Sequence, residues 1–183
     1  MLHKGWHSRG YLPHFDSPET IQFVTFRLFD SLPRALAETL AAQADNLART
    51  DHALDGGLGS CWLKEPQIAQ MVEEAFLHFD GERYHLLAWC VMPNHVHIVI
   101  EPNEAHGLGA IVQAWKSFTA KQANRLLGRR GPFWHKDYFD RYVRDEEHLN
   151  RTVDYVENNP VKAGLARSIT DWPWSSARFR GRP

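Results

Sequence analysis

The chain has 183 residues, of which 43% are hydrophobic and 23% charged, and its formal net charge is −1 at pH 7. This composition is that of an ordinary soluble domain. The net charge by itself argues against a generic nucleic-acid binder, and no apolar run approaches the roughly 18 residues of a membrane span. The two cysteines are too few for a disulfide framework and residues 1–10 lack the apolar stretch of a secretory signal, so we expect one cytoplasmic domain over residues 1–183.

The first half of the chain gives one strand signal followed by two helix signals. Alternating apolar residues favour a strand, Ser31 suits the N-cap of the helix after it, and Pro66 suits the first turn of another. We therefore predict a strand at 21–28, a helix from 32 to 50, a Gly-rich loop at 51–60 and a helix at 65–79. Because residues 45–62 carry no motif, we interpret them as a peripheral excursion.

Residues 84–101, YHLLAWCVMPNHVHIVIE, predict a β-hairpin that turns at Met92-Pro93-Asn94. The β-branched residues after the turn favour an extended chain. In a strand, His95 and His97 point to one face, whereas the residues between and after them give the other face an apolar surface.

Two imidazoles on one strand face can both bind a divalent cation and leave coordination positions open. His95 and His97 are candidate metal ligands for this reason. Taken alone, however, such a pair is more often a structural or surface feature than a metal site, and the residues by themselves leave both interpretations open.

The next segment concentrates basic charge. Residues 108–128 predict a helix with an apolar inner face, from which Lys116, Lys121 and Arg125 point away, and residues 131–144 predict a loop and a short strand. Between 116 and 144, eight basic residues stand against two acidic ones, with aromatic rings interleaved, a mixture typical of surfaces that bind nucleic acid. The alternative is that the rings belong to the core. The predicted DNA-binding residues are Lys116, Lys121, Arg125, Arg129, Arg130, Trp134, Lys136, Arg141 and Arg144.

A last helix is predicted after Asp145, a good N-cap followed by two glutamates that suit the positive end of the helix dipole. Tyr155 and Asn159 lie one turn apart on the same face, and because Pro160 disfavours helical geometry at Asn159, its carboxamide should sit in the last turn. A half-buried structural tyrosine is the alternative interpretation. At the C-terminus, we expect the tryptophans of WPWSS to dock and the basic end to form a loose tail.

In combination, these motifs resemble the single-tyrosine HUH transposases, and within them the REP-associated tyrosine transposases. The likeness rests on PNHVH, FWHKDYFDRYVR, TVDYVENNPVKAGL and WPWSS, and it covers nearly the whole chain from about Gly10. The resemblance implies an α+β fold with a ferredoxin-like central antiparallel sheet flanked by helices. One departure is His135, where relatives often have glutamine, and its role is left open.

The resemblance also implies the roles of four residues. His95 and His97 would bind Mg²⁺ or Mn²⁺, Asn159 would complete the metal shell, and Tyr155 would be the nucleophile. Tyr138 and Tyr142 are rival nucleophiles, but neither has a carboxamide one helical turn onward.

The activity that this implies is that of a single-stranded DNA endonuclease and strand transferase, which cuts beside DNA hairpins through a 5′-phosphotyrosine. Two alternatives remain at this point: a catalytically inactive DNA-binding protein, and a metal-dependent phosphodiesterase that uses water. The expected partner is single-stranded or hairpin DNA, without a membrane, and the chain could be a monomer or a homodimer that exchanges its tyrosine helices.

Overall fold

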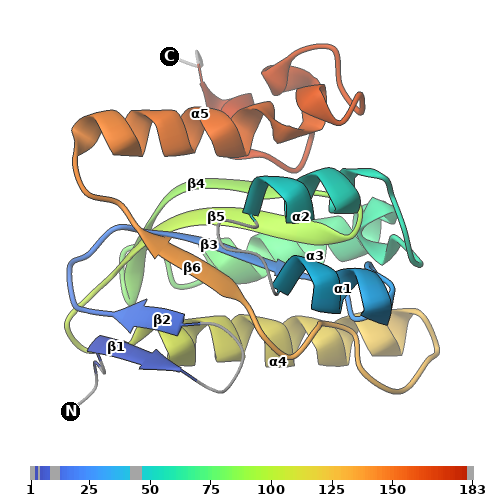
Figure 1. Cartoon of the computed structure of the whole chain (residues 1–183), viewed down its shortest axis with the longest axis horizontal. Coiled ribbons are helices and arrows are strands. Elements are labelled where there is room, and N and C mark those ends of the chain that lie inside the picture. Colours follow the sequence, from blue (N-terminus) through green and yellow to red (C-terminus); the bar gives the residue numbers. More distant parts are fainter. Residues whose placement is uncertain (1–2, 4, 9–12, 42–46, 181–183) are drawn as a thin grey trace.

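The structure is a computed structural model that describes residues 3, 5–8, 13–41 and 47–180. It contains a four-stranded antiparallel sheet in the order β4-β5-β3-β6, and a hairpin of β1 and β2 lies beside it (Figure 1). The strands are β1 (Gly5–Ser8), β2 (Pro13–Asp16), β3 (Gln22–Arg27), β4 (Tyr84–Val91), β5 (His95–Pro102) and β6 (Phe139–Tyr142). The helices are α1 (Arg34–Ala41), α2 (Leu47–Asp55), α3 (Pro66–Leu77), α4 (Leu108–Leu126) and α5 (Glu146–Lys162), with short 3-10 helices η1 (Trp62–Lys64), η2 (Ile169–Asp171) and η3 (Ser176–Phe179).

From β3 onward, the chain follows the strand and helix order of a ferredoxin-like domain. β3 is followed by helices, then by the β4–β5 hairpin, then by α4 and β6, which is the β-α-β-β-α-β succession. The predicted α+β fold with a central antiparallel sheet is therefore confirmed. None of the helices in the described part of the chain has both the length and the apolar character that crossing a membrane requires.

The two faces of the sheet are covered by different helices. α3 and α4 pack on one face, whereas α5 lies across the other (Figure 1). Val96, Ile98 and Ile100 of β5 belong to the core cluster under α3 and α4, and Val99 belongs to the second cluster under α5. The alternation expected from the sequence is thus observed, and it places both histidines on the face that α5 covers.

The predicted helix after Asp145 is confirmed as α5. The Asp145 carboxylate accepts a hydrogen bond from the backbone N–H of His148 at 2.7 Å, which satisfies one of the free donors at the helix start. The helix continues through Pro160 to Lys162, so Asn159 lies in its last turn, as expected. Asn159 therefore lies within the regular helix, one turn after Tyr155.

The structure corrects the prediction for the segment before η1. Residues 51–55 are helical and complete α2, whereas the sequence predicted a loop from Asp51; residues 42–46, which the predicted helix was to cross, lie outside the described residues. The helix persists because Leu54 packs with Leu32 and Leu40, and it ends at the Gly56-Gly57 pair. The Gly richness of the segment marks the end of the helix rather than a loop throughout.

The C-terminal segment wraps the β4 edge of the sheet. The backbone N–H of Val91 donates to the carbonyl of Trp174 at 2.8 Å, which confirms the predicted docking of this region. Arg178 donates two hydrogen bonds to the buried Glu73 at 2.7 and 2.8 Å, and Arg180 forms an ion pair with the buried Glu157. The predicted loose basic tail is therefore wrong at both arginines; the third, Arg182, lies outside the described residues.

Candidate active site

The paired histidines sit in the middle of the sheet, completely shielded from solvent. Antiparallel pairing places His97 between Thr25 of β3 and Cys90 of β4, and both imidazoles are 0% exposed. The Nε2 atoms of His95 and His97 lie 2.9 Å apart and face each other. Burial lowers the pKa of each histidine to about 3, and for His95 the neighbouring His97 adds to the effect. Both rings are therefore neutral near pH 7, the form in which imidazole binds metals.

Asn94 fixes the orientation of His95. Its side-chain amide donates to the carbonyls of Leu54 and Leu58 at 3.0 and 3.1 Å, so its Oδ1 atom must face the histidine. The Nδ1–H of His95 donates to that oxygen at 2.8 Å. This hydrogen bond places the proton on Nδ1 and leaves the lone pair of Nε2 directed into the site, which is how second-shell groups prepare a metal-binding histidine.

The predicted nucleophile lies against its own histidine pair. The ring of Tyr155 is 5.8 Å from that of His97 and 6.0 Å from that of Phe23, measured between centroids. Burial, followed by the negative charge of Asp51, raises the pKa of Tyr155, and a hydrogen bond from Asn159 opposes this shift only in part. The phenol is therefore protonated in this arrangement, and its reactivity requires a compensating positive charge.

Two further residues of α5 surround the tyrosine. Asn159 is buried, and its side-chain amide donates to the Tyr155 carbonyl at 3.0 Å. The ammonium group of Lys162 lies 4.6 Å from the centroid of the Tyr155 ring. Tyr155, Asn159 and Lys162 thus follow one stripe of α5 toward the histidines, because side chains four and seven residues apart share a helix face.

Asp51, which no motif in the sequence singles out, enters the site from α2. The carboxylate accepts a hydrogen bond from the Tyr155 hydroxyl, and its Oδ2 atom lies 4.0 Å from Nε2 of His97. Asp51 lies in the segment that we interpreted as peripheral, and that interpretation is wrong for this residue. No local pattern in the sequence identifies Asp51, because its neighbours in the site are 44 and 46 positions away or, for Tyr155, 104 positions away.

The site has the donor atoms and the electrostatic character that a divalent cation requires. One ligand atom each of Asp51, His95 and His97 lies within 4.8 Å of the others, and all three residues are buried. The Oδ1 atom of Asp51 and Nδ1 of His97 have no hydrogen-bond partner among the described residues. Neutral imidazoles beside a carboxylate with one oxygen free of hydrogen bonds fit a doubly charged cation, since nitrogen and oxygen donors of this kind bind such ions.

The predicted DNA-binding residues divide into buried and accessible ones. Lys116 is 8% exposed and donates to the carbonyls of Lys136 and Asp137 at 2.9 and 3.2 Å, whereas Trp134 is 6% exposed and donates to Thr119 at 2.8 Å. The prediction that Lys116 points outward is wrong, and Trp134 is a core ring that cannot stack on a base. Arg129 is half-buried, and the exposed residues are Lys121, Arg125, Arg130, Lys136, Arg141 and Arg144.

The sheet separates these exposed cations. Arg141 pairs in register with Phe23, so it shares the face of the sheet on which α5 and the histidines lie. Lys121 and Arg125 belong to α4, which covers the opposite face. His135 is half-buried; burial and then the charge of Arg27 lower its pKa to about 4, so it is neutral near pH 7 and adds no positive charge to the surface.

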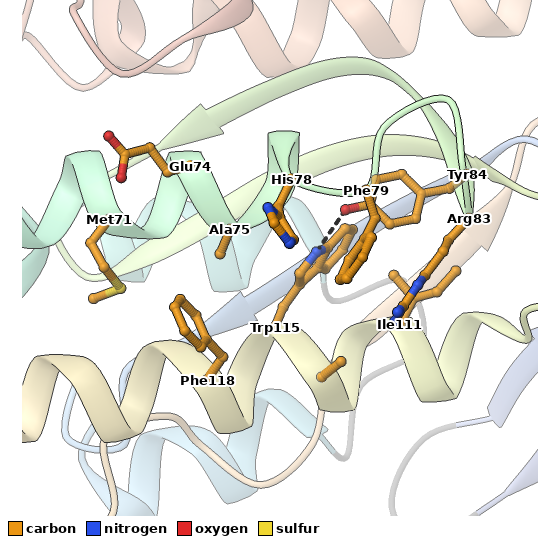
Figure 2. A pocket seen from close by; sticks show the side chains of 11 residues that line it. Met71, Glu74, Ala75, His78, Phe79, Arg83, Tyr84, Ile111, Trp115 and Phe118 are labelled. Carbon is orange, nitrogen blue, oxygen red and sulfur yellow. Dashed lines mark hydrogen bonds between the residues drawn. The ribbon is translucent and has the colours of Figure 1, made fainter.

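A large hollow between α3 and α4 lies on the other side of the sheet from this site. It has a volume of about 500 Å³, and apolar and aromatic side chains line most of it, including Phe79, Trp115 and Phe118 (Figure 2). Trp115 donates to the hydroxyl of Tyr84 at 3.1 Å within its wall (Figure 2). The hollow contains none of the candidate catalytic or metal-binding residues.

Comparison with known proteins places this geometry in a family. An Escherichia coli K12 protein named REP-associated tyrosine transposase is 28% identical over 108 residues, which are 58% of this chain and 63% of that protein. A Haemophilus influenzae protein assigned provisionally to the same type is 29% identical over 103 residues, or 51% of this chain and 58% of that protein. The chain thus spans less than two thirds of the length of these relatives.

A solved structure shares the fold. It is described as a REP-associated tyrosine transposase bound to a REP hairpin, with a TM-score of 0.60 and 20% identity over 93% of this chain and 86% of that one. Residues 63–159 match the model of the family described as transposase IS200 like, a range that contains both histidines, Tyr155 and Asn159 but not Asp51. The chain therefore belongs to the IS200-like transposase family.

Proposed function

We propose that the protein is a single-stranded DNA endonuclease and strand transferase that acts on DNA hairpins through a covalent 5′-phosphotyrosine. The observation that carries the proposal is the position of Tyr155, whose phenol lies beside the buried pair His95 and His97 of the same chain. The names of the relatives and the REP hairpin in the related solved structure support a palindromic DNA substrate for this chain as well.

Each residue of the site has a role in this proposal. His95, His97 and Asn159 would hold Mg²⁺ or Mn²⁺, and Tyr155 would be the nucleophile. When bound, the cation would polarise the scissile phosphate and offset the negative charge that develops on its oxygens. α5 presents the phenol from one side of the site, and the hydrophobic contacts around Val156 keep the helix against the sheet.

The proposed reaction conserves the ester bond. The Tyr155 oxygen forms a bond to phosphorus, the bond from phosphorus to the 3′ oxygen of the DNA breaks, and the phenolic proton passes through solvent to the released 3′ hydroxyl. In the joining step, another 3′ hydroxyl attacks the phosphotyrosine, and Tyr155 regains its proton. Cleavage and joining are the same transfer in opposite directions, so ATP is not consumed.

The exposed cations would hold the DNA backbone. Lys121, Arg125, Arg130, Lys136, Arg141 and Arg144 are accessible, and Arg129 is half-buried. Exposed rings such as Phe118 and Tyr142 could stack on unpaired bases, each stack being worth about 1–3 kcal/mol. Binding that depends on phosphate contacts weakens steeply as salt rises. We also propose that residues 1–183 act as one domain in the cytoplasm.

The test is to trap the covalent intermediate. The protein is incubated with Mn²⁺ and a hairpin with a flanking single strand, labelled so that the label stays on the 5′-phosphate side of the cut, and a denaturing gel shows whether label migrates with protein. We expect a labelled band for the natural protein and for Tyr138→Phe and Tyr142→Phe, but none for Tyr155→Phe. Cleavage that survives in Tyr155→Phe without a band would indicate attack by water. Hairpin binding without cleavage would indicate an inactive DNA-binding protein.

A further inference from the structure

Asp51 has no role yet in the proposed mechanism, which uses His95, His97, Asn159 and Tyr155. It lies on α2, before the part of the chain that matches the family, and its side chain is buried, with 3% of the residue exposed. α2 is fixed at this place because Leu54 packs in a small apolar cluster and its carbonyl accepts the Asn94 side chain. The carboxylate is therefore held in the site by the fold.

The two oxygens of Asp51 have different environments. Oδ2 accepts the hydrogen bond from the Tyr155 hydroxyl and faces Nε2 of His97 at 4.0 Å. Oδ1 has no hydrogen-bond partner among the described residues, although it is buried. A buried carboxylate costs free energy unless hydrogen bonds or a positive charge compensate it. The charge of Lys162 favours the ionised form of Asp51, but the Oδ1 atom itself accepts no hydrogen bond from the described residues.

The missing partner is best supplied by a cation shared with the histidines. The donor atoms of Asp51, His95 and His97 converge within 4.8 Å, and all three residues are buried. We propose that Asp51 is a third protein ligand of the metal and that, through its hydrogen bond to Tyr155, it also positions the nucleophile. This inference rests on the proposed function and adds to it a residue from outside the family match.

Charge ranks Asp51 above Asn159 as a ligand. The side-chain nitrogen of Asn159 donates to the backbone carbonyl of Tyr155, and the carboxamide oxygen that could face a metal is neutral. A carboxylate contributes a full negative charge to the cation, which favours hard ions such as Mg²⁺ and Mn²⁺. Loss of Asp51 should therefore weaken metal binding more than loss of Asn159 does.

Binding of Mn²⁺, measured without DNA, tests the assignment. The metal-free full-length protein is titrated with Mn²⁺, and the free ion is followed by its electron paramagnetic resonance signal. We expect Asp51→Ala to weaken binding at least tenfold, Asp51→Asn to weaken it by a smaller factor, and Asn159→Ala to weaken it less than Asp51→Ala. Asp51→Asn keeps the shape and an acceptor for Tyr155, so it decides the question if Asp51→Ala does not fold by circular dichroism.

Asp55 provides a matched control because it lies one turn further along α2 and its charge acts on Asp51 through space. Asp55→Asn should leave Mn²⁺ binding within about twofold of the natural protein. An equal loss of Mn²⁺ affinity in Asp55→Asn and Asp51→Asn would mean that these aspartates act only through their negative charge. If both Asp51 variants bound Mn²⁺ as tightly as the natural protein, Asp51 would not be a metal ligand. If His97→Ala abolished Mn²⁺ binding, either result would overturn the role of Asp51 but leave the proposed function intact. If the unmodified protein bound no Mn²⁺, the proposed metal chemistry would be overturned as well.

Discussion

At the scale of single residues, Asn94 connects the metal-binding histidine to α2. Its oxygen accepts a hydrogen bond from the Nδ1–H of His95, and its amide donates to the carbonyls of Leu54 in α2 and of Leu58 in the loop after it. The oxygen of Asn94 therefore orients the metal-binding histidine, whereas its nitrogen holds the segment around the end of α2. Different substitutions can remove one role and keep the other.

We expect Asn94→Ala to weaken Mn²⁺ binding by about 10- to 100-fold, because loss of a second-shell partner usually has an effect of this size. Asn94→Asp keeps an acceptor for His95 but cannot donate to Leu54 and Leu58, so it should retain more of the metal affinity while still lowering the free energy of unfolding. Titration with Mn²⁺ and urea unfolding measure the two effects. Asn158→Ala, which removes a half-buried carboxamide that donates to the carbonyl of Asp154 within α5, is the control. The same metal affinity in Asn94→Ala and Asn158→Ala would contradict the role of Asn94.

The residues of the site that the sequence identified share one property: their positions follow from local periodicity. The alternation of β5 places His95 and His97 on one face, and the helical repeat of α5 places Asn159 one turn after Tyr155. The errors concern side chains whose surroundings come from distant segments. Lys116 follows the buried Trp115 in a helix, and its ammonium group donates to the backbone of residues 136 and 137, about 20 positions away. Asp51 could not be placed for the same reason.

At the scale of elements, the return of the chain from α2 to the sheet depends on one close backbone contact. Gly59 has a φ of +83°, and a Cβ at this position would lie 2.5 Å from the carbonyl oxygen of Asp30. The next residue, Ser60, donates its backbone N–H to the Asp30 carboxylate at 2.9 Å. Asp30 thus holds the loop between α2 and η1 against the end of β3.

We expect Gly59→Ala to lower the free energy of unfolding by more than Gly57→Ala does. Gly57 also has a positive φ, of +68°, but open space surrounds its Cβ position, so alanine there should cost only the left-handed backbone, about 1–2 kcal/mol. Gly59→Ala adds the clash with Asp30 to this cost. Urea unfolding of the two variants measures the difference, and equal losses would show that the contact is not rigid.

His14 joins β2 to β6 in a buried cluster of charges. Its Nε2 atom lies 3.2 Å from Asp137, and its Nδ1 atom forms a short hydrogen bond with Asp140. Burial alone lowers the pKa of His14, but the hydrogen bonds and charges of the two aspartates outweigh burial and raise it to about 9. The protonated ring is therefore the form that the folded protein prefers.

Stability should fall as this histidine loses its proton. The pKa in the folded protein, about 9, lies above the ordinary value of 6.5, so the contribution is complete below pH 6.5 and disappears as the pH rises through 9. The full effect is at most on the order of 3 kcal/mol. Urea unfolding from pH 6 to 10 should show this loss in the natural protein but a flatter profile in His14→Gln. If the free energy of unfolding of the two proteins changed in parallel with pH, the two aspartates would not stabilise the protonated form of His14.

At the scale of the whole molecule, one chain holds the tyrosine and the histidines together. Tyr155 contacts His97 of its own chain, and α5 is fixed to its own sheet by Val156 and by the ion pair of Glu157 with Arg180. The tyrosine helix in this arrangement does not need a neighbouring chain.

A mixing experiment tests this arrangement. His97→Ala lacks a metal ligand and Tyr155→Phe lacks the nucleophile, so a mixture of the two variants should yield no labelled covalent band on the denaturing gel. Chains that exchange their tyrosine helices would instead recover the band, because one mixed site would contain both natural residues. The natural protein diluted to the same concentration serves as the reference.

The wrapping of the C-terminal segment around β4 has a consequence for self-association. The segment forms hydrogen bonds with Trp89 and Val91, and Arg178 and Arg180 fasten it to helices on opposite faces of the sheet, so it covers the end of β4 against another polypeptide. Continuation of the sheet from one molecule into the next, a common route both to pairing and to fibrous aggregates, is thereby obstructed at this end of the strand.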